Sequence, residues 1–223
     1  MAIQTQLANG SLIGGGGQAF LGANVHAKPI DYGTLGHYRV VAVAPLVADQ
    51  SANSRLFELR NSGVNLIIPT LVEVELLAVG DVTTEKLVWL SMYGCTNFTA
   101  VDTASASIPA AMVVRPTGMS AAPGGAQVRV VTAAGASGGM TGWTSTKDAG
   151  AHGQFLAWMA SASAERPARV KRWVDPAEID VHKPVYSANQ GFVIEHASVG
   201  SATDNNIHVL ITVAWAEVPA NGY

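Results

Sequence analysis

The chain has 223 residues, of which 13% are charged and 48% are hydrophobic, and its formal net charge is −3. This charged fraction is about half of the roughly 25% found in ordinary soluble domains, so either small uncharged side chains cover much of the surface or neighbouring subunits bury it. A weakly acidic chain has no electrostatic attraction for nucleic acid or for an anionic membrane, and we expect neither partner.

The length suits one domain, because all-β sandwiches of this size often form a single core. No stretch approaches ~18 uncharged apolar residues, and the N-terminus lacks the basic and apolar parts of a signal peptide. We therefore expect a soluble product made in the cytoplasm. The low charge favours a homo-oligomer, with a weakly charged monomer as the alternative.

Residues 1–36 are rich in glycine, including the run 14–17, and contain only short apolar pairs such as Leu12 and Ile13. Such a composition cannot build its own core, so it predicts an extended N-terminal arm that either stays mobile or gains order by lying on a neighbouring subunit. The glycine run precedes Gln-Ala-Phe and no Lys-Ser/Thr pair, which argues against a phosphate-binding loop. The globular domain is expected to comprise residues 37–223.

From residue 37 onward, short β-rich runs alternate with turn signals, which is typical of a β-sandwich or jelly roll. Strands are expected at residues 37–44, which end before a proline, and at residues 55–60, which end at an Asn-Ser-Gly turn. The runs 65–68 and 71–79 flank Pro69, which cannot donate a ladder hydrogen bond and therefore belongs at an edge or a bulge.

In residues 71–79 an apolar face alternates with a face that carries two glutamates, which predicts a half-buried strand. Residues 86–93 are apolar on both faces and are expected to form a central, covered strand, with a short buried helix as the alternative. A further alternating strand is expected at residues 126–132. Residues 155–163 are expected to form at most one or two helical turns, and residues 133–153 a glycine-rich loop.

The C-terminal part predicts a hairpin, with strands at residues 192–199 and 207–218 joined by residues 200–206. In the last strand one face carries a continuous apolar stripe that must lie against a core. The stripe consists of Ile207, Val209, Ile211, Val213 and Trp215. The hairpin would bring His196 and His208 near each other, and we interpret both as residues that face solvent.

The residues that could serve catalysis or metal binding are scattered along the sequence. The six histidines have no metal-binding spacing, the acidic pairs lie in no recognisable apolar pocket, and no nucleophile motif occurs. Cys95, the only cysteine, excludes an internal disulfide and is interpreted as a buried structural thiol. We therefore expect no metal, no cofactor and no enzymatic activity.

The tryptophans are more informative. Trp89 and Trp215 lie within expected strands and are interpreted as core residues. Trp143 ends the loop sequence GGMTGW and is the one candidate for an exposed aromatic platform. Anchoring of a protein interface is favoured there over stacking on a sugar, because interfaces are enriched in tryptophan.

Several runs of the sequence carry a resemblance to a known class of protein. They are RLFELRNSG at residues 55–63 with LIIP at 66–69, RPTGMSAAPGG at 115–125, NQGFVIE at 189–195 and ITVAWAE at 211–217. These runs are similar to runs in small β-sandwich virion proteins of tailed bacteriophages. The resemblance implies a non-enzymatic decoration (cement) protein, commonly a homotrimer, that binds the major capsid protein on the capsid exterior and stabilises the shell. The alternative is a tail or fibre component that binds a cell-surface glycan, and a third reading is a sandwich enzyme acting on polysaccharide.

The candidate interface residues come from the arm and from two glycine-rich loops, at residues 115–125 and 138–143. They are Leu12, Ile13, Gly14, Phe20, Arg115, Pro116, Met119, Met140 and Trp143. The arm should add contact area on a neighbouring subunit, because its glycines let the backbone lie close to another chain.

Overall fold

The computed structural model describes residues 36–47, 50–82, 85–103, 105–108, 113, 123–132, 139–159, 169–175, 183–198 and 206–220. The predicted arm and the predicted contact residues Leu12, Ile13, Gly14, Phe20, Arg115, Pro116 and Met119 lie outside these residues. Within the described part, every regular element longer than a single residue is a β-strand, so the chain is an all-β protein, as predicted.

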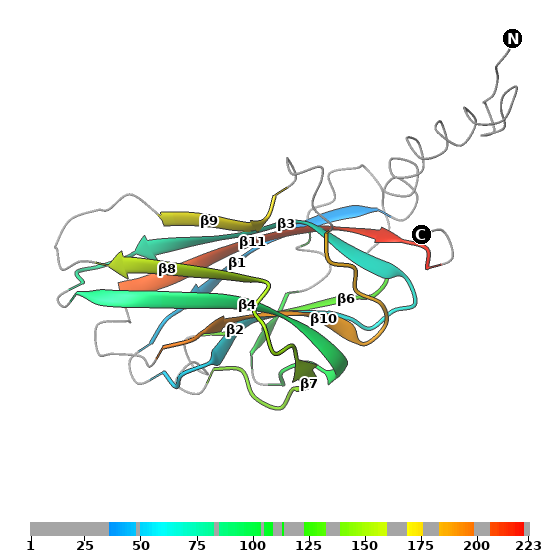
Figure 1. The fold of residues 1–223 in the computed structure, drawn as a ribbon, viewed down its shortest axis with the longest axis horizontal. Coiled ribbons are helices and arrows are strands. Elements are labelled where there is room, and N and C mark those ends of the chain that lie inside the picture. The colour runs from blue at the N-terminus through cyan, green and yellow to red at the C-terminus, as the bar shows by residue number, and fades with distance from the viewer. Residues whose placement is uncertain are drawn as a thin grey trace, which may run out of the picture.

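The strands form two antiparallel sheets that stack as the layers of a sandwich (Figure 1). The four-stranded sheet has the order β1 (His37–Pro45), β11 (Ile207–Val218), β3 (Leu66–Ala78), β9 (Arg169–Val174). The larger sheet has the order β5 (Ala106–Ser107), β6 (Ala126–Val130), β2 (Ser54–Asn61), β10 (Gln190–His196), β4 (Lys86–Ala100), β7 (Thr144–Lys147), and β8 (Gly153–Met159) also pairs with β4.

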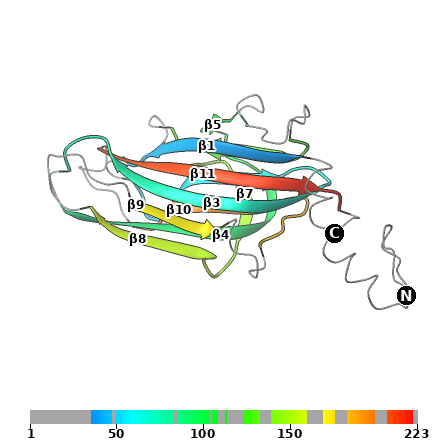
Figure 2. The same cartoon turned by 90° about the horizontal axis from the view of Figure 1, so that it is seen from above.

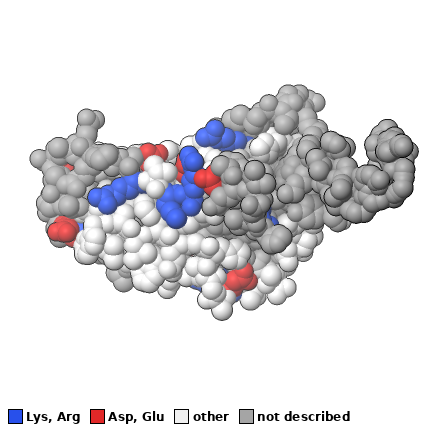
Figure 3. Space-filling view, turned by 45° about the horizontal axis from the view of Figure 1, so that its top comes forward, with Lys and Arg blue, Asp and Glu red and all other residues white. Residues whose placement is uncertain are grey.

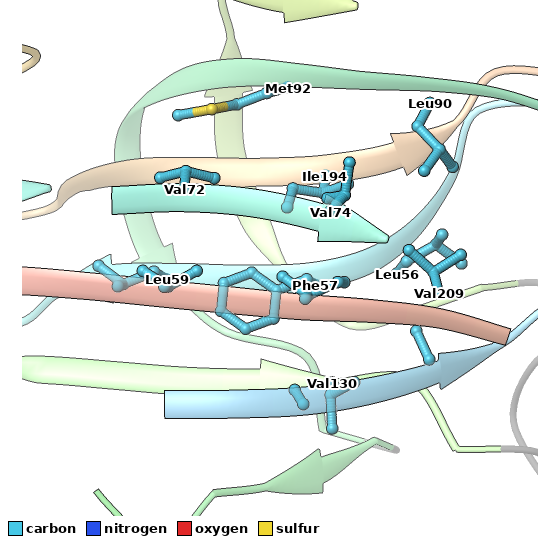
Figure 4. Packing of buried hydrophobic residues seen from close by; sticks show 14 of the residues in the cluster. Leu56, Phe57, Leu59, Val72, Val74, Leu90, Met92, Val130, Ile194 and Val209 are labelled. Atoms are coloured by element: carbon cyan, nitrogen blue, oxygen red, sulfur yellow. The ribbon is translucent and has the colours of Figure 1, made fainter. Parts of the chain in front are cut away.

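The main core lies between the two sheets and receives side chains from the longer strands of both sheets (Figure 4). The predicted apolar stripe of β11 is confirmed, because all five of its residues are fully buried. Val72, Val74 and Leu76 of β3 lie on the same side, while Glu73 and Glu75 are only partly buried on the other. Period-2 alternation thus correctly identified the faces of β3 and β11 that lie against the main core, although the opposite face of β11 is also buried from Thr212 onward.

Pro69 lies at a bulge, as predicted. The register between β3 and β11 shifts there, with Leu71 opposite Ala214 but Pro69 opposite Trp215, so Thr70 is the extra residue. A proline is tolerated at this point because the bulge already interrupts the hydrogen-bond ladder.

The predicted C-terminal hairpin is wrong. β10 pairs with β2 and β4, whereas β11 pairs with β1 and β3, so the two strands lie in different sheets. Each strand is central and has both edges occupied, and the connection between them therefore crosses from one sheet to the other. The prediction that His196 faces solvent is also wrong, because it is fully buried and lies 3.0 Å from the Ser198 hydroxyl.

Two further predictions differ from the structure. The segment expected to form helical turns begins as strand β8, whose residues Phe155, Ala157 and Met159 face inward. The region expected to be a long loop up to residue 153 contains β7, which pairs with the far end of β4. The run 86–93 is a strand, as predicted, but only its Val88, Leu90 and Met92 face is fully covered.

Candidate functional site

A group of charged side chains lies on the outer face of the larger sheet. Arg55 and Glu58 of β2 and Glu195 of β10 point away from the main core, yet they are only 2%, 0% and 3% exposed. A bulge in β2 explains the position of Arg55. The pairing with β10 skips Leu56, so Leu56 and Phe57 both join the main core and Arg55 returns to the outer face.

The Arg55 guanidinium is held by acids and by aromatic rings. Its Nη1 lies 2.9 Å from Glu58 Oε1, its Nε lies 3.6 Å from Glu195 Oε1, and its Nη2 donates to Ser145 Oγ at 2.9 Å. Its central carbon lies 3.4 Å from the ring centroid of Trp143 and 5.9 Å from that of Phe98. Arginine suits this position because its planar cation both forks to carboxylates and stacks on rings.

Lys147 completes the group from β7. Its Nζ lies 2.5 Å from Glu195 Oε2 and 4.2 Å from the Tyr93 ring centroid. The two glutamates are thus matched by two cations, of which Lys147 is partly exposed. This balance is required, because an unpaired charge buried at this depth would cost several kcal/mol, on the order of 3–5.

Glu58 also holds nearby backbone segments beside this group of charged side chains. Its Oε2 accepts the backbone N–H of Asp102 at 2.9 Å, and the buried Asp102 carboxylate in turn accepts the N–H groups of Ser105 and Thr141. These bonds join the segment that follows β4 to the segment that precedes β7. Burial raises the pKa of Glu58 above its ordinary value, against the lowering effect of the bonds from Asp102 and Arg55.

Two glycines let the segment before β7 lie close to the sheet. Gly139 and Gly142 have φ angles of +68° and +77°, in the left-handed region that favours glycine. A side chain on Gly139 would collide with Ser54, and one on Gly142 with Thr103. Gly139 and Gly142 of the predicted GGMTGW loop therefore allow a close approach within this chain.

Trp143 is the exposed part of the site. Its ring is 38% exposed, its Nε1–H donates to the carbonyl of Met140 at 3.1 Å, and the buried Arg55 lies against it. The prediction of a partly exposed aromatic platform at Trp143 is consistent with this position. Met140 differs, because it is 3% exposed and belongs to the main core, so it is not available for an interface.

A small apolar cluster extends the covered region. Cys95, Phe98 and Val193 are buried together on the outer face, beside Tyr93 and Val101. Cys95 is a buried thiol, as predicted, and burial raises its pKa, which disfavours the reactive thiolate. We call these residues together the covered cluster: the charged side chains of Arg55, Glu58, Glu195 and Lys147, and the apolar Cys95, Phe98 and Val193. The covered cluster therefore combines paired charges with apolar packing, an arrangement that holds a surface rigid.

The sequence analysis missed a second surface on the same sheet, which we call the β4/β8 patch. It consists of Leu87, Trp89, Leu156 and Trp158. Leu156 and Trp158 are 51% and 54% exposed, and they lie opposite Trp89 and Leu87 across the pairing of β4 with β8. Trp89 was predicted to be a core residue, and this prediction is wrong, because its side chain is only partly buried. Residues 155–159 are apolar on both strand faces, so alternation gave no signal for which face is exposed.

Searches against family models, curated proteins and solved structures found no match for the chain. Among the described residues, no three His, Cys, Asp or Glu side chains are grouped so that they would hold a metal ion. The same part of the chain has no helix of the length and hydropathy needed to cross a membrane.

Proposed function

We propose that this chain is a non-enzymatic structural protein of a tailed-phage virion, which binds the major capsid protein on the outside of the shell as a decoration protein. It would be made in the host cytoplasm, assemble as a homo-oligomer, with a trimer as the expected state, and require no cofactor. Each bound copy buries surface across a joint between capsid subunits and so raises the free energy needed to open the shell.

The observation that carries the proposal is the partly exposed Trp143 ring, which lies against the buried Arg55 guanidinium. A rigid aromatic side chain loses little conformational entropy on binding, which is why such residues dominate the energetics of protein interfaces. The low charged fraction of the chain, 13%, supports a protein partner. Uncharged residues make up most of the described surface in view in Figure 3, apart from a group of Lys and Arg side chains.

The test measures binding of the purified chain to emptied heads of the phage that encodes it, by co-sedimentation. The wild-type chain is expected to sediment with the heads at a saturating stoichiometry. Trp143→Ala should weaken this binding by ~30-fold or more, as expected for a central aromatic anchor that contributes about 2 kcal/mol. Val64→Ala is the matched control, because Val64 is also an exposed apolar residue, at 83%, and lies away from the cluster.

Wild-type protein that stays in the supernatant at every concentration would contradict the decoration role. In that case the same protein is applied to a glycan array. Binding that Trp143→Ala abolishes would then favour the alternative role as a glycan-binding tail or fibre component, because sugars stack on exposed aromatic faces.

A further inference from the structure

The β4/β8 patch lies at an open sheet edge. Among the described residues, β8 pairs only with β4, and Figure 2 shows β8 at one border of the molecule, opposite β1. In an antiparallel pair, alternate residues direct their N–H and C=O groups away from the partner strand. The outer edge of β8 therefore offers unpaired backbone groups beside two exposed apolar side chains.

Proteins usually protect such edges with charged side chains, prolines or bulges. β9, at the corresponding border of the other sheet, carries Arg169, Lys171 and Arg172. β1, at the opposite border, carries Arg39 and ends at Pro45. β8 has the sequence GQFLAWM and pairs with β4 without a register shift, so it has none of these protections.

We propose that β8 is a self-association edge, at which the β8 strand of a second copy of this chain pairs antiparallel about a two-fold axis at Leu156. A two-fold contact apposes a surface to itself, so it suits a strand edge that carries no charged side chain, such as that of β8. The proposal concerns contact between copies and does not depend on the capsid-binding role.

The sequence of β8 complements itself in this register. With Leu156 opposite Leu156 of the second copy, all seven residues of the strand have a partner. On the outer face, Trp158 then lies opposite Gln154, which places a tryptophan on each side of the central leucine pair. On the inner face, Phe155 lies opposite Ala157, and Met159 lies opposite Gly153, so each large side chain meets a small one.

This contact would merge the larger sheets of two copies into one continuous sheet and cover the most exposed apolar residues of the β4/β8 patch. It predicts assemblies with an even number of chains. If the expected trimer also forms through another surface, the two-fold contact links trimers to one another, and the two contacts together give a hexamer.

A cysteine cross-linking experiment tests the register. Leu156→Cys should form a disulfide-linked dimer under mild oxidation, because directly opposite residues in neighbouring strands have the separation that a disulfide needs. Val170→Cys is the matched control, since Val170 is 52% exposed on β9 against 51% for Leu156. Cross-linking of Leu156→Cys is expected to be at least about tenfold faster, because the contact holds the two thiols together.

The wild-type chain should give no cross-link, because its Cys95 is buried. Solution mass by light scattering provides the second measurement. Leu156→Lys places two like charges opposite each other and should halve the mass, whereas Val170→Lys should leave it unchanged, with circular dichroism verifying the fold of both variants. Equal cross-linking rates for the two cysteine variants, or a wild-type mass that Leu156→Lys does not alter, would overturn the proposal.

These outcomes are distinct from those of the capsid experiment. If the two-fold contact is not found but the chain co-sediments with phage heads, only the self-association proposal is wrong. If the two-fold contact is found but the chain does not co-sediment, only the decoration role is wrong.

Discussion

At the scale of single residues, Arg55 is the side chain on which the covered cluster depends. Replacing it with methionine keeps much of the apolar volume but leaves Glu58 and Glu195 near each other with no buried cation between them. Removing one partner of a buried ion pair typically costs about 3–5 kcal/mol. We therefore expect Arg55→Met to lower the free energy of unfolding by that amount in urea titrations.

The control for this substitution is Arg172→Met. Arg172 also forms ion pairs, with Glu73 and Asp175, but its side chain is 53% exposed. Exposed pairs contribute little to stability because water and salt screen them. A loss of stability as large as that of Arg55→Met would show that burial is not what makes the Arg55 cluster important.

Glu58 predicts a pH dependence of stability. Its pKa is raised above the ordinary 4.5, so in the interval between 4.5 and the raised value the folded state binds more protons than the unfolded state. The free energy of unfolding must then fall as the pH rises through this interval. Stability of the wild type relative to Glu58→Gln should accordingly decrease from acidic to neutral pH.

Chemical unfolding of both proteins across this range measures the effect, and the difference between them removes the contribution of the other carboxylates. A difference that stays constant with pH would mean that burial does not dominate the environment of Glu58. The opposite slope would mean that the Arg55 pair lowers the pKa more than burial raises it.

The covered cluster also marks the limit of prediction for single residues. Strand alternation indicates that Glu58 and Glu195 point away from the core side of their strands. It does not indicate that they are buried, because Asp102, which bonds to Glu58, and Lys147, which pairs with Glu195, come from distant segments. Trp143 was identified from its glycine-rich loop, whereas its contact with Arg55 depends on long-range packing.

At the scale of elements, β10 is a central strand that tolerates no added volume at Gly191. This residue lies between Arg60 of β2 and Cys95 of β4, and a Cβ there would overlap the carbonyl oxygen of Leu59. Because the obstacle is backbone, relief requires the strands to separate. Gly191→Ala should lower the free energy of unfolding by about 1–3 kcal/mol or more.

Gly150→Ala is the matched control, since a Cβ at Gly150 would meet nothing within 4 Å. Thermal and urea unfolding of the two variants should therefore differ clearly. Equal stabilities would indicate that β2 and β10 can shift apart without cost.

The strands themselves were largely predictable where a β-rich run was bounded by proline or by turn residues. β1, β2, β3, β4, β6, β10 and β11 correspond to runs predicted as strands, although β4 was predicted from an apolar run in which period-2 alternation fails. Pairing was not predictable to the same extent. The connection between β10 and β11 is compatible with a hairpin or with a crossing between sheets, and only the occupancy of both edges of each strand decides between them.

At the scale of the whole molecule, it is clear why local sequence patterns did not predict which strands pair. A sandwich is closed by contacts between residues far apart in the sequence, such as β1 with β11 and β2 with β10. The segment of β8 was interpreted as helical turns because its own residues do not specify a neighbour. Its place at the border follows from pairing with β4, which only the assembled sheet provides.

The predicted N-terminal arm, which lies outside the described residues, can be tested at the scale of the whole molecule. The glycine-rich composition of residues 1–36 predicts that they build no core of their own. Deleting residues 1–22 should therefore leave the urea unfolding midpoint unchanged, while it weakens co-sedimentation with phage heads if the arm adds contact area. A truncated chain that fails to fold would assign the arm to the core. A truncated chain that folds and sediments as well as the full chain would remove the arm from the binding surface and leave Trp143 as its anchor.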